Sequence, residues 1–201
     1  MAIREIRKWG DEILLKPCKN VKEVTKRTQE LIKDMMETMR EAGGVGLAAP
    51  QVGVLKRIMI VETEPDSPVV FINPVIIKKS GEQTGYEGCL SIPGKTGIVT
   101  RPDYVEVEAY NEKMEKFTLE AKELFARAIC HECDHLDGKL YVDLVEGELK
   151  NTEDLLDEDE NVSEVEDEEA GAHRPFLSSI YLVSNIPEGL FLIENLDLIH
   201  M

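Results

Sequence analysis

Apolar side chains recur with helical spacing early in the chain. They lie three and four residues apart at Leu31, Ile32, Met35, Met36 and Met39, and this spacing places them on one face of an α-helix. Thr25 is suited to cap the N-terminus of this helix, and Gly43 and Gly44 end the pattern. A shorter turn is predicted between Asp11, which can cap it, and Pro17, which ends it.

The middle of the chain changes to short apolar runs and to alternation, which predict β-strands. The predicted strands are residues 57–61, 69–78, 98–100, 104–110 and 117–119. Asn73 and Pro74 are expected to break the second of these strands, because proline cannot donate a hydrogen bond to a neighbouring strand. The last two strands are expected to pair across a turn at residues 111–113.

A second long helix is predicted over residues 121–136. Asp137 and Gly138 end it, since glycine suits the left-handed conformation that follows many helices. Residues 141–144 predict a last apolar turn or strand.

The negative charge of the chain is concentrated near its end. The formal net charge is −17, from 23 basic and 40 acidic residues. Thirteen acidic residues and one basic residue fall between Glu146 and Glu169, so the rest of the chain is only mildly acidic. Residues 157–160 and 166–169 are runs of like charge that repel one another and predict disorder. An apolar ending, residues 176–201, follows without a clear period.

Composition argues against several functional classes. No basic stripe indicates nucleic-acid binding, and no apolar stretch of about 18 residues predicts a membrane span. The N-terminus lacks the apolar region of a secretory signal. We therefore expect a cytoplasmic protein whose four cysteines are reduced, and reduced thiols are available as metal ligands or as buried side chains.

The segment with the clearest chemistry is His131-Glu132-Cys133-Asp134-His135, which reads H-E-x-x-H. Residues four apart share one face of a helix, so His131 and His135 can bind one metal ion. Glu132 is offset from them and can act on a water molecule beside the metal. The motif also occurs by chance on exposed helices, and a catalytic site needs a third ligand from elsewhere.

Two further segments combine small residues with reactive groups. Residues 43–53 are rich in glycine and alanine, which lets the backbone approach a ligand closely, and Gln51 offers an amide donor. The segment fits neither glycine-rich phosphate-loop pattern. In residues 86–94, Cys89 offers a thiolate, which together with His131 and His135 gives a Cys-His-His site with an open fourth position. Cys130 and Cys133 are expected to be buried thiols.

These three segments resemble the signature motifs of bacterial-type peptide deformylases. The motifs are a G-x-G-L-A-A-x-Q loop, an E-G-C-L-S segment and an H-E-x-D-H helix, and here they end at Gln51, Ser91 and His135 in that order. The resemblance covers roughly residues 1–150. It implies a metal-dependent hydrolase that removes the N-formyl group from the formylmethionine of newly synthesised polypeptides and releases formate.

The resemblance also implies the catalytic residues. Cys89, His131 and His135 would hold one divalent metal ion per chain, Fe²⁺ in the cell, with Zn²⁺, Ni²⁺ or Co²⁺ able to replace it. Glu132 would be the general base and then the acid that protonates the leaving amine. Gln51 and the backbone N–H of Leu90 would stabilise the oxyanion.

The same resemblance implies a peptide site. Val45, Gly46 and Gly88 would hydrogen-bond the substrate backbone as an added strand. The pocket for the methionine side chain would be lined by Glu87, Leu124, Arg127 and Ala128. Arg101 would lie near the far end of the peptide.

We expect an α+β fold, with mixed antiparallel β-sheets packed around a central metal-binding helix, an N-terminal helix and an acidic C-terminal extension. Residues 1–153 would form the catalytic domain, and residues 154–201 an acidic, disordered tail with an apolar ending. The expected partners are N-formylmethionyl nascent peptides and the ribosome, with the chain acting as a monomer. Some family members dock a C-terminal helix on the ribosome, but ribosomal RNA would repel this acidic tail.

Two alternatives use the same helix motif. A zincin-type protease shares H-E-x-x-H but takes its third ligand from a downstream His or Glu, whereas Cys89 lies upstream here. A metal-stabilised binding protein without turnover would leave Glu132 and Gln51 idle. An assay with a formylated and an unformylated peptide distinguishes these possibilities.

Overall fold

The computed structural model describes residues 2–154, and two long helices and two antiparallel sheets form most of this part. The helices are α1 (Lys26–Glu41) and α2 (Glu123–Leu136), with short helices η1 (Glu12–Leu15), η2 (Ala49–Val52) and η3 (Tyr141–Asp143). The strands are β1 (Gly46–Ala48), β2 (Ile58–Val61), β3 (Val69–Ser80), β4 (Gln83–Cys89), β5 (Ile92–Arg101), β6 (Tyr104–Tyr110), β7 (Lys116–Lys122) and β8 (Lys150–Asn151).

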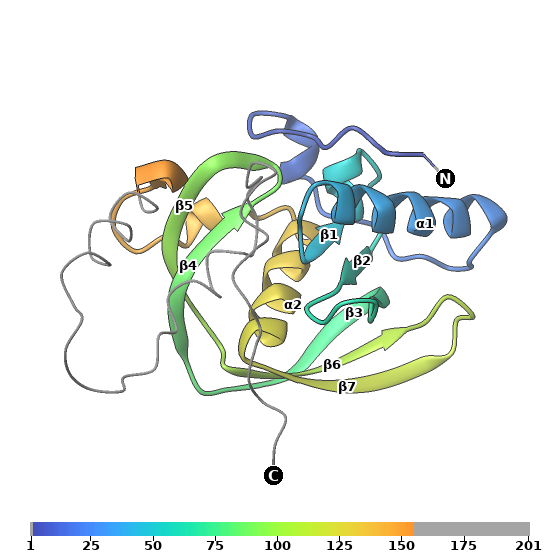
Figure 1. Ribbon diagram of the computed structural model, residues 1–201. Helices are drawn as coiled ribbons and strands as arrows, with labels where there is room; N and C mark the ends of the chain where they lie inside the picture. Colours follow the sequence, from blue (N-terminus) through green and yellow to red (C-terminus); the bar gives the residue numbers. More distant parts are fainter. Residues whose placement is uncertain (1, 155–201) are drawn as a thin grey trace, which may run out of the picture.

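The larger sheet has the strand order β1-β2-β3-β6-β7, and every neighbouring pair is antiparallel. The smaller sheet has the order β4-β5-β8. β1 and β4 are therefore edge strands of their sheets. Figure 1 shows α2 at the centre of the molecule, with the β4–β5 hairpin on one side and β1, β2 and β3 on the other.

The main core lies between α1, α2 and the larger sheet. It contains the apolar face of α1, including Leu31, Ile32, Met35 and Met39, and the fully buried strand β2. A second, smaller cluster joins Cys89 and Ile92 of the β4–β5 hairpin to Leu14 of η1 and Tyr141 of η3. The two clusters lie on either side of α2, and His131, Glu132 and His135 of this helix are buried.

The ends of both long helices follow from local chemistry. The Thr25 side chain accepts a hydrogen bond from the Thr28 N–H and caps α1. After α2, Gly138 has a φ of 75°, and a Cβ at this position would lie 2.6 Å from the Leu15 carbonyl oxygen. Only glycine tolerates both the left-handed backbone and this close approach.

Several elements confirm the predictions from the sequence. The short turn capped by Asp11, the helix α1 and the strands β2 and β6 lie where the sequence pattern places them. The pairing of β6 with β7 is confirmed, although β7 is longer than predicted. Residues 141–144 form a short helix, η3, and its C-cap.

Other predictions were wrong in detail. β3 runs unbroken through Asn73 and Pro74, because a register shift between Ile72 and Val75 accommodates the proline as a bulge. α2 begins at Glu123, since residues 121 and 122 still belong to β7. The strands β1 and β4, and most of β5, were not predicted as strands. The predicted disordered tail lies, apart from Asp154, outside the described residues.

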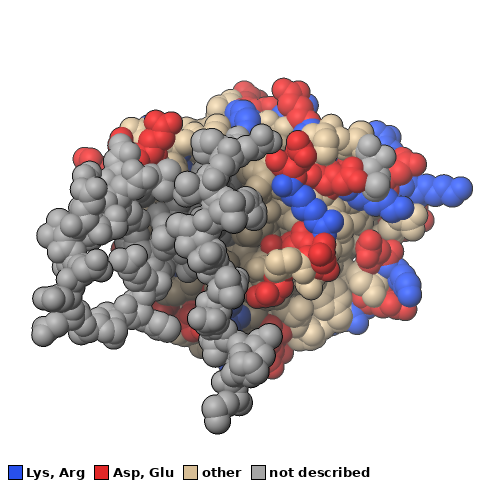
Figure 2. All heavy atoms as spheres, viewed as in Figure 1, with Lys and Arg blue, Asp and Glu red and all other residues tan. Residues whose placement is uncertain are grey.

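Charges of both signs are interspersed on the described surface. Figure 2 shows Lys and Arg side chains next to Asp and Glu side chains over the region of α1, in the same view as Figure 1. Ion pairs such as Arg40–Glu62 join neighbouring charges there. Among the described residues, no helix is long and apolar enough to cross a membrane.

Candidate metal centre and active site

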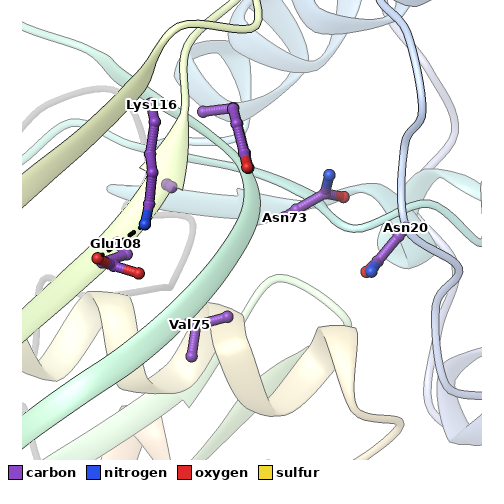
Figure 3. Close-up of a pocket in the computed structure, with 7 residues that line it drawn as sticks. Asn20, Asn73, Val75, Glu108 and Lys116 are labelled. Carbon is purple, nitrogen blue, oxygen red and sulfur yellow. Dashed lines mark ion pairs between the residues drawn. The ribbon is translucent and has the colours of Figure 1, made fainter.

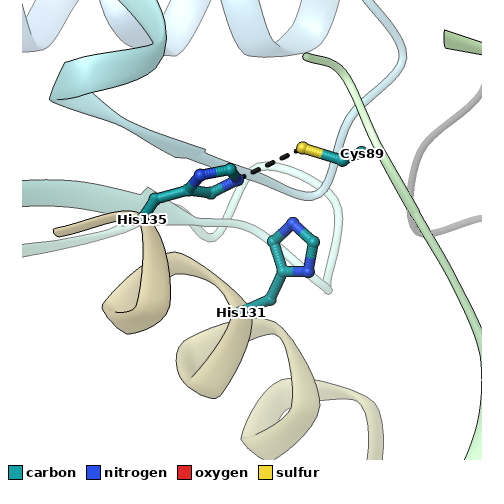
Figure 4. A group of neighbouring side chains, drawn as sticks. All are labelled: Cys89, His131 and His135. Atoms are coloured by element: carbon teal, nitrogen blue, oxygen red, sulfur yellow. Dashed lines mark hydrogen bonds between the residues drawn. The ribbon is translucent and has the colours of Figure 1, made fainter. Parts of the chain in front are cut away.

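Three side chains with metal-binding atoms meet beside α2. Cys89 ends β4, and His131 and His135 lie one turn apart on α2. One ligand atom from each lies within 4.8 Å of the others, and the Cys89 Sγ is 3.2 Å from the Nε2 of His135. Figure 4 shows both imidazole rings directed toward the Cys89 sulfur. All three residues are at most 2% exposed.

The chemistry of this cluster fits a metal ion. One thiolate and two imidazoles are ligands that zinc, iron and other transition metals accept. The Nδ1 of His131 is 3.1 Å from the Glu87 carboxylate, which leaves its Nε2 for a metal. Second-sphere carboxylates of this kind orient metal-binding histidines. Three protein ligands also leave a position for water or substrate, as catalytic sites require.

Glu132 lies beside the cluster and is almost fully buried. Its Oε2 has no hydrogen-bond partner, and burial raises the pKa of its carboxyl to about 7. Gly46 of β1 packs against it so closely that a Cβ at Gly46 would clash with the Oε1. A carboxyl group with this pKa can both accept and donate a proton near neutral pH.

The two histidines differ in electrostatics. Burial alone lowers the pKa of His131, but hydrogen bonds to Cys89 and Glu87 outweigh burial and hold that pKa well above its usual value. Burial and the neighbouring His131 hold the pKa of His135 well below its usual value. The two rings therefore differ in their pKa although they lie on one helix.

Glu87 is the centre of a buried ion network. Its Oε1 accepts hydrogen bonds from the Arg101 Nε at 2.9 Å and from the Arg127 Nη1 at 2.8 Å. Its Oε2 accepts one from the Arg101 Nη2 at 3.0 Å and faces His131. Arg101 also bonds Asp134, whose role was not foreseen from the sequence although it belongs to the helix motif. The network connects both arginines to a histidine of the cluster.

The expectation that Arg101 lies near the far end of a bound peptide stays a prediction. The Arg101 guanidinium is 6% exposed and is engaged by Glu87 and Asp134. Arg127 is also buried, and it donates hydrogen bonds to the carbonyl oxygens of Gln83 and Val99. Both arginines thus tie the β4–β5 hairpin together.

Gln51 reaches the cluster from η2, and Leu90 directly follows Cys89. The Gln51 Nε2 lies 3.6 Å from the Cys89 Sγ and 3.2 Å from the Ser91 Oγ, and its Oε1 accepts a hydrogen bond from the Ala48 N–H. Leu90 occupies the tight turn between Cys89 and Ile92, which are paired strand residues. The hydrogen bond from Gln51 to the Ser91 Oγ was not predicted from the sequence, although Ser91 follows Leu90 in the motif.

The remaining candidate residues lie on or beside β1, β4 and α2. Gly46 lies in β1 and Gly88 in β4, while Val45 directly precedes β1. Both strands are sheet edges, where backbone groups are available to an added strand. Leu124 and Ala128 lie on α2, with Ala128 fully buried and Leu124 partly buried.

Cys130 and Cys133 are buried in the main core and are not part of the cluster of possible metal ligands. The expectation that they are buried thiols is confirmed. The Cys133 Sγ contacts the Met59 Sδ at 3.9 Å. Burial raises the pKa of Cys130 above its ordinary value. These two thiols therefore belong to the packing of the helix.

A surface pocket lies away from this cluster. It is lined by residues of β3, β6 and β7 and by Asn20, and the ion pair between Lys116 and Glu108 crosses it (Figure 3). Its lining includes neither the cluster residues nor Glu132. The chemistry of the described residues is therefore concentrated at α2.

A buried Cys-His-His cluster with an adjacent carboxylate, held between two antiparallel sheets, is typical of a metal-dependent hydrolase with an α+β fold. Comparison with known proteins narrows the class. Residues 3–151 match the family model described as polypeptide deformylase. The chain belongs to the polypeptide deformylase family. It is an enzyme that removes the N-formyl group from nascent peptides.

Individual relatives agree with this assignment. A peptide deformylase of Lachnoclostridium phytofermentans is 56% identical over 162 residues, which cover 80% of this chain and 99% of that protein. Peptide deformylase 1 of Bacillus subtilis is 49% identical over 142 residues, 70% of this chain and 89% of that protein. A solved peptide deformylase from Thermotoga maritima is 34% identical with a TM-score of 0.71, covering 73% of this chain and 100% of that one.

Proposed function

We propose that Glu132 is the general base of the deformylation. Its carboxylate lies beside the cluster, is shielded from bulk water and has a pKa near 7, so it can take a proton from the attacking water. The same carboxyl then returns the proton to the amine that leaves when the C–N bond breaks. The buried, unpartnered Oε2 of Glu132 is the observation that carries this assignment.

Cys89, His131 and His135 are proposed to hold one metal ion. When bound, the metal would supply Lewis acidity, which lowers the pKa of a coordinated water to about 7. Fe²⁺ is the proposed metal in the cell, with Zn²⁺, Ni²⁺ and Co²⁺ as substitutes, because a mixed thiolate and imidazole set suits each of these ions.

Gln51 and the N–H of Leu90 are proposed to stabilise the oxyanion. The Gln51 amide nitrogen is held near Cys89 by its contacts with Ala48 and Ser91, so its orientation is fixed before substrate binds. Fixed donors of this kind typically contribute about 10²–10³-fold each to turnover, because they are strongest where charge develops.

The formylated peptide is proposed to bind as an extended strand between β1 and β4. Val45 and Gly46 offer backbone groups from one edge, and Gly88 offers them from the other. Leu124 and Ala128 are proposed to contact the methionine side chain, together with the aliphatic parts of Glu87 and Arg127. Arg101 is proposed to lie near the far end of the peptide, with its guanidinium held by the ion network.

We further propose that the chain works in the cytoplasm as a monomer that meets its substrates at the ribosome. The acidic run that begins at Asp154 would be repelled by ribosomal RNA. Docking through a basic terminal helix is therefore not proposed. Residues 1–153 are proposed to form the catalytic domain, and residues 154–201 a tail outside it.

Replacing Glu132 tests the catalytic assignment. Glu132→Gln is expected to retain metal, because no ligand changes, and to lose about 10²–10⁴-fold in kcat, because an amide cannot accept the proton. The assay compares formyl-Met-Ala-Ser with the unformylated peptide, and metal content is measured on the same sample. Glu41→Gln, an exposed change at the end of α1, is the control for charge. Near wild-type turnover in metal-loaded Glu132→Gln would refute the role.

A further inference from the structure

The N-terminal strap, residues 2–18, contacts all three segments that carry the site. The Arg7 N–H donates to the Gln51 carbonyl at 2.7 Å, and the Trp9 N–H donates to the Ser91 carbonyl at 2.8 Å. The Cys18 N–H donates to the carbonyl of Leu136 at the end of α2 at 2.8 Å. One continuous stretch of backbone therefore joins segments that are far apart in the sequence.

A side chain of the strap adds a fourth contact. The Lys8 Nζ donates a hydrogen bond of 2.9 Å to the carbonyl oxygen of Leu90. Leu90 and Ser91 are the two residues of the turn between β4 and β5, so Lys8 and the Trp9 N–H together bind both carbonyl groups of this turn. The Lys8 ammonium is thus directed at the residue whose N–H is proposed to face the oxyanion.

Anchoring the Leu90 carbonyl restricts the Leu90 N–H. The two groups of one residue are connected through only two soft dihedral angles, φ and ψ, because the flanking peptide bonds are planar. With the carbonyl held by Lys8, and Cys89 held by its strand pairing to Ile92, the direction of the N–H is fixed. Without the ammonium, the Leu90 carbonyl loses a charge-assisted hydrogen bond.

The other end of the strap is also anchored. Arg4 donates from its Nε and Nη2 to one carboxylate oxygen of Asp34 on α1, at 3.1 and 2.9 Å. The Arg4 N–H donates to the Thr38 Oγ1 at 2.9 Å. Together with the backbone bonds of Trp9 and Cys18, these bonds hold the strap on both sides of Lys8, so its side chain reaches the turn from a fixed base.

We propose that Lys8 is a positioning residue for deformylation, acting through the Leu90 carbonyl to hold the Leu90 N–H where charge develops on the formyl oxygen. The inference rests on the proposed role of Gln51 and the Leu90 N–H as oxyanion donors. Donors that act on developing charge stabilise the transition state more than the bound substrate. Loss of Lys8 therefore lowers kcat and leaves KM largely unchanged.

The test compares Lys8→Met, Lys8→Arg and Lys33→Met in the full metal-loaded chain with formyl-Met-Ala-Ser. Lys33 is exposed on α1, so its replacement removes the same charge away from the site. Lys8→Met is expected to lower kcat about tenfold, less than the 10²–10³-fold of a deleted donor, because the Leu90 N–H is displaced and not removed. Lys8→Arg is expected to keep most of the wild-type kcat, since a guanidinium also donates a hydrogen bond to a carbonyl.

Three results would overturn the role of Lys8: a kcat in Lys8→Met equal to that of Lys33→Met, a rise in KM at constant kcat, or a parallel loss of metal or Tm. The last result would assign Lys8 to folding alone. Gln51→Ala, assayed alongside, separates the two proposals. If Gln51→Ala keeps full turnover, the oxyanion assignment itself fails and the Lys8 role fails with it. If Gln51→Ala is impaired and Lys8→Met is not, only the Lys8 role fails.

Discussion

The carboxylate of Glu87 is buried with two guanidinium groups and one imidazole. Burial alone raises the pKa of Glu87, but hydrogen bonds from His131 and Arg101 outweigh burial and hold that pKa well below its usual range. Buried charges are tolerated only when each is paired, since removing one partner leaves an uncompensated charge. The network therefore works as a unit that fixes the His131 ring, and through it the geometry of the proposed metal ligands.

The Cys-His-His cluster was predictable from sequence and the network was not. The spacing of His131 and His135 follows from helix geometry, and Cys89 is the cysteine of the E-G-C-L-S segment. Arg101 meets Glu87 only because β4 and β5 form a hairpin in which Gln83 pairs with Arg101 and Glu87 with Gly97. A contact that depends on strand register has no signature in residue spacing alone.

Replacing the cysteines one at a time by serine tests which of them is the third proposed metal ligand. Cys89→Ser is expected to retain much less metal, because a serine hydroxyl is a poorer ligand than a thiolate for transition metals. Cys130→Ser and Cys133→Ser are expected to retain metal like the wild type, since both thiols lie in the core and outside the cluster. Metal per chain, measured after anaerobic purification, gives the comparison. Equal loss in all three variants would mean that Cys89 is not the distinguishing ligand.

At the scale of elements, sequence patterns found the regular segments and missed the glycine-rich ones. α1 and β6 have clear periods, 3.6 and 2, and both were predicted. β4 contains two glycines, and β5 contains Pro93 and two glycines, so neither shows alternation over its whole length. These residues lower strand propensity, but cross-strand pairing and burial against η3 compensate for it. The missed strands are the ones that hold the site.

The attachment of the N-terminal strap to α1 is expected to depend on pH. Hydrogen bonds from the Ala2 N–H and from Arg4 lower the pKa of Asp34 below its ordinary value of 3.8. A carboxyl with a lowered folded-state pKa stabilises the fold above its unfolded pKa, and this contribution is lost as the pH falls through the folded value. Asp34→Asn is therefore expected to have a lower Tm than the wild type. This difference should be largest above about pH 5 and should shrink below about pH 4.

A matched variant controls this pH series. Glu30→Gln removes one negative charge from an exposed position on the same helix and leaves Arg4 untouched. Trp9, the only tryptophan of the chain, lies on the strap and is 55% exposed, so its fluorescence reports on the strap separately from global unfolding. A Tm difference for Asp34→Asn that stays constant from pH 7 to pH 3 would contradict the predicted linkage.

At the scale of the molecule, function is concentrated in the part that the family model matches. The match covers residues 3–151, and within it lie the proposed metal ligands, Glu132, both proposed oxyanion donors and all but the first residue of the strap. The strongly acidic run lies almost entirely beyond it, from Asp154 onward. Composition therefore divides the chain at nearly the position where the family resemblance ends.

A chain ending at Asp154 is expected to fold and to deformylate with a kcat/KM similar to that of the full chain. The reason is that the described members of the two core clusters and of the ion network all lie within the part of the chain that is kept. The opposite result would be expected if the apolar ending, residues 176–201, packed against the catalytic domain. If that segment covered core surface, its removal would expose an apolar patch and lower solubility.

Measuring kcat/KM and Tm for both chains, with a full-length control in which the acidic residues 157–160 become amides, separates the effect of charge from that of length. A large loss of either quantity in the short chain alone would show that the ending belongs to the working domain.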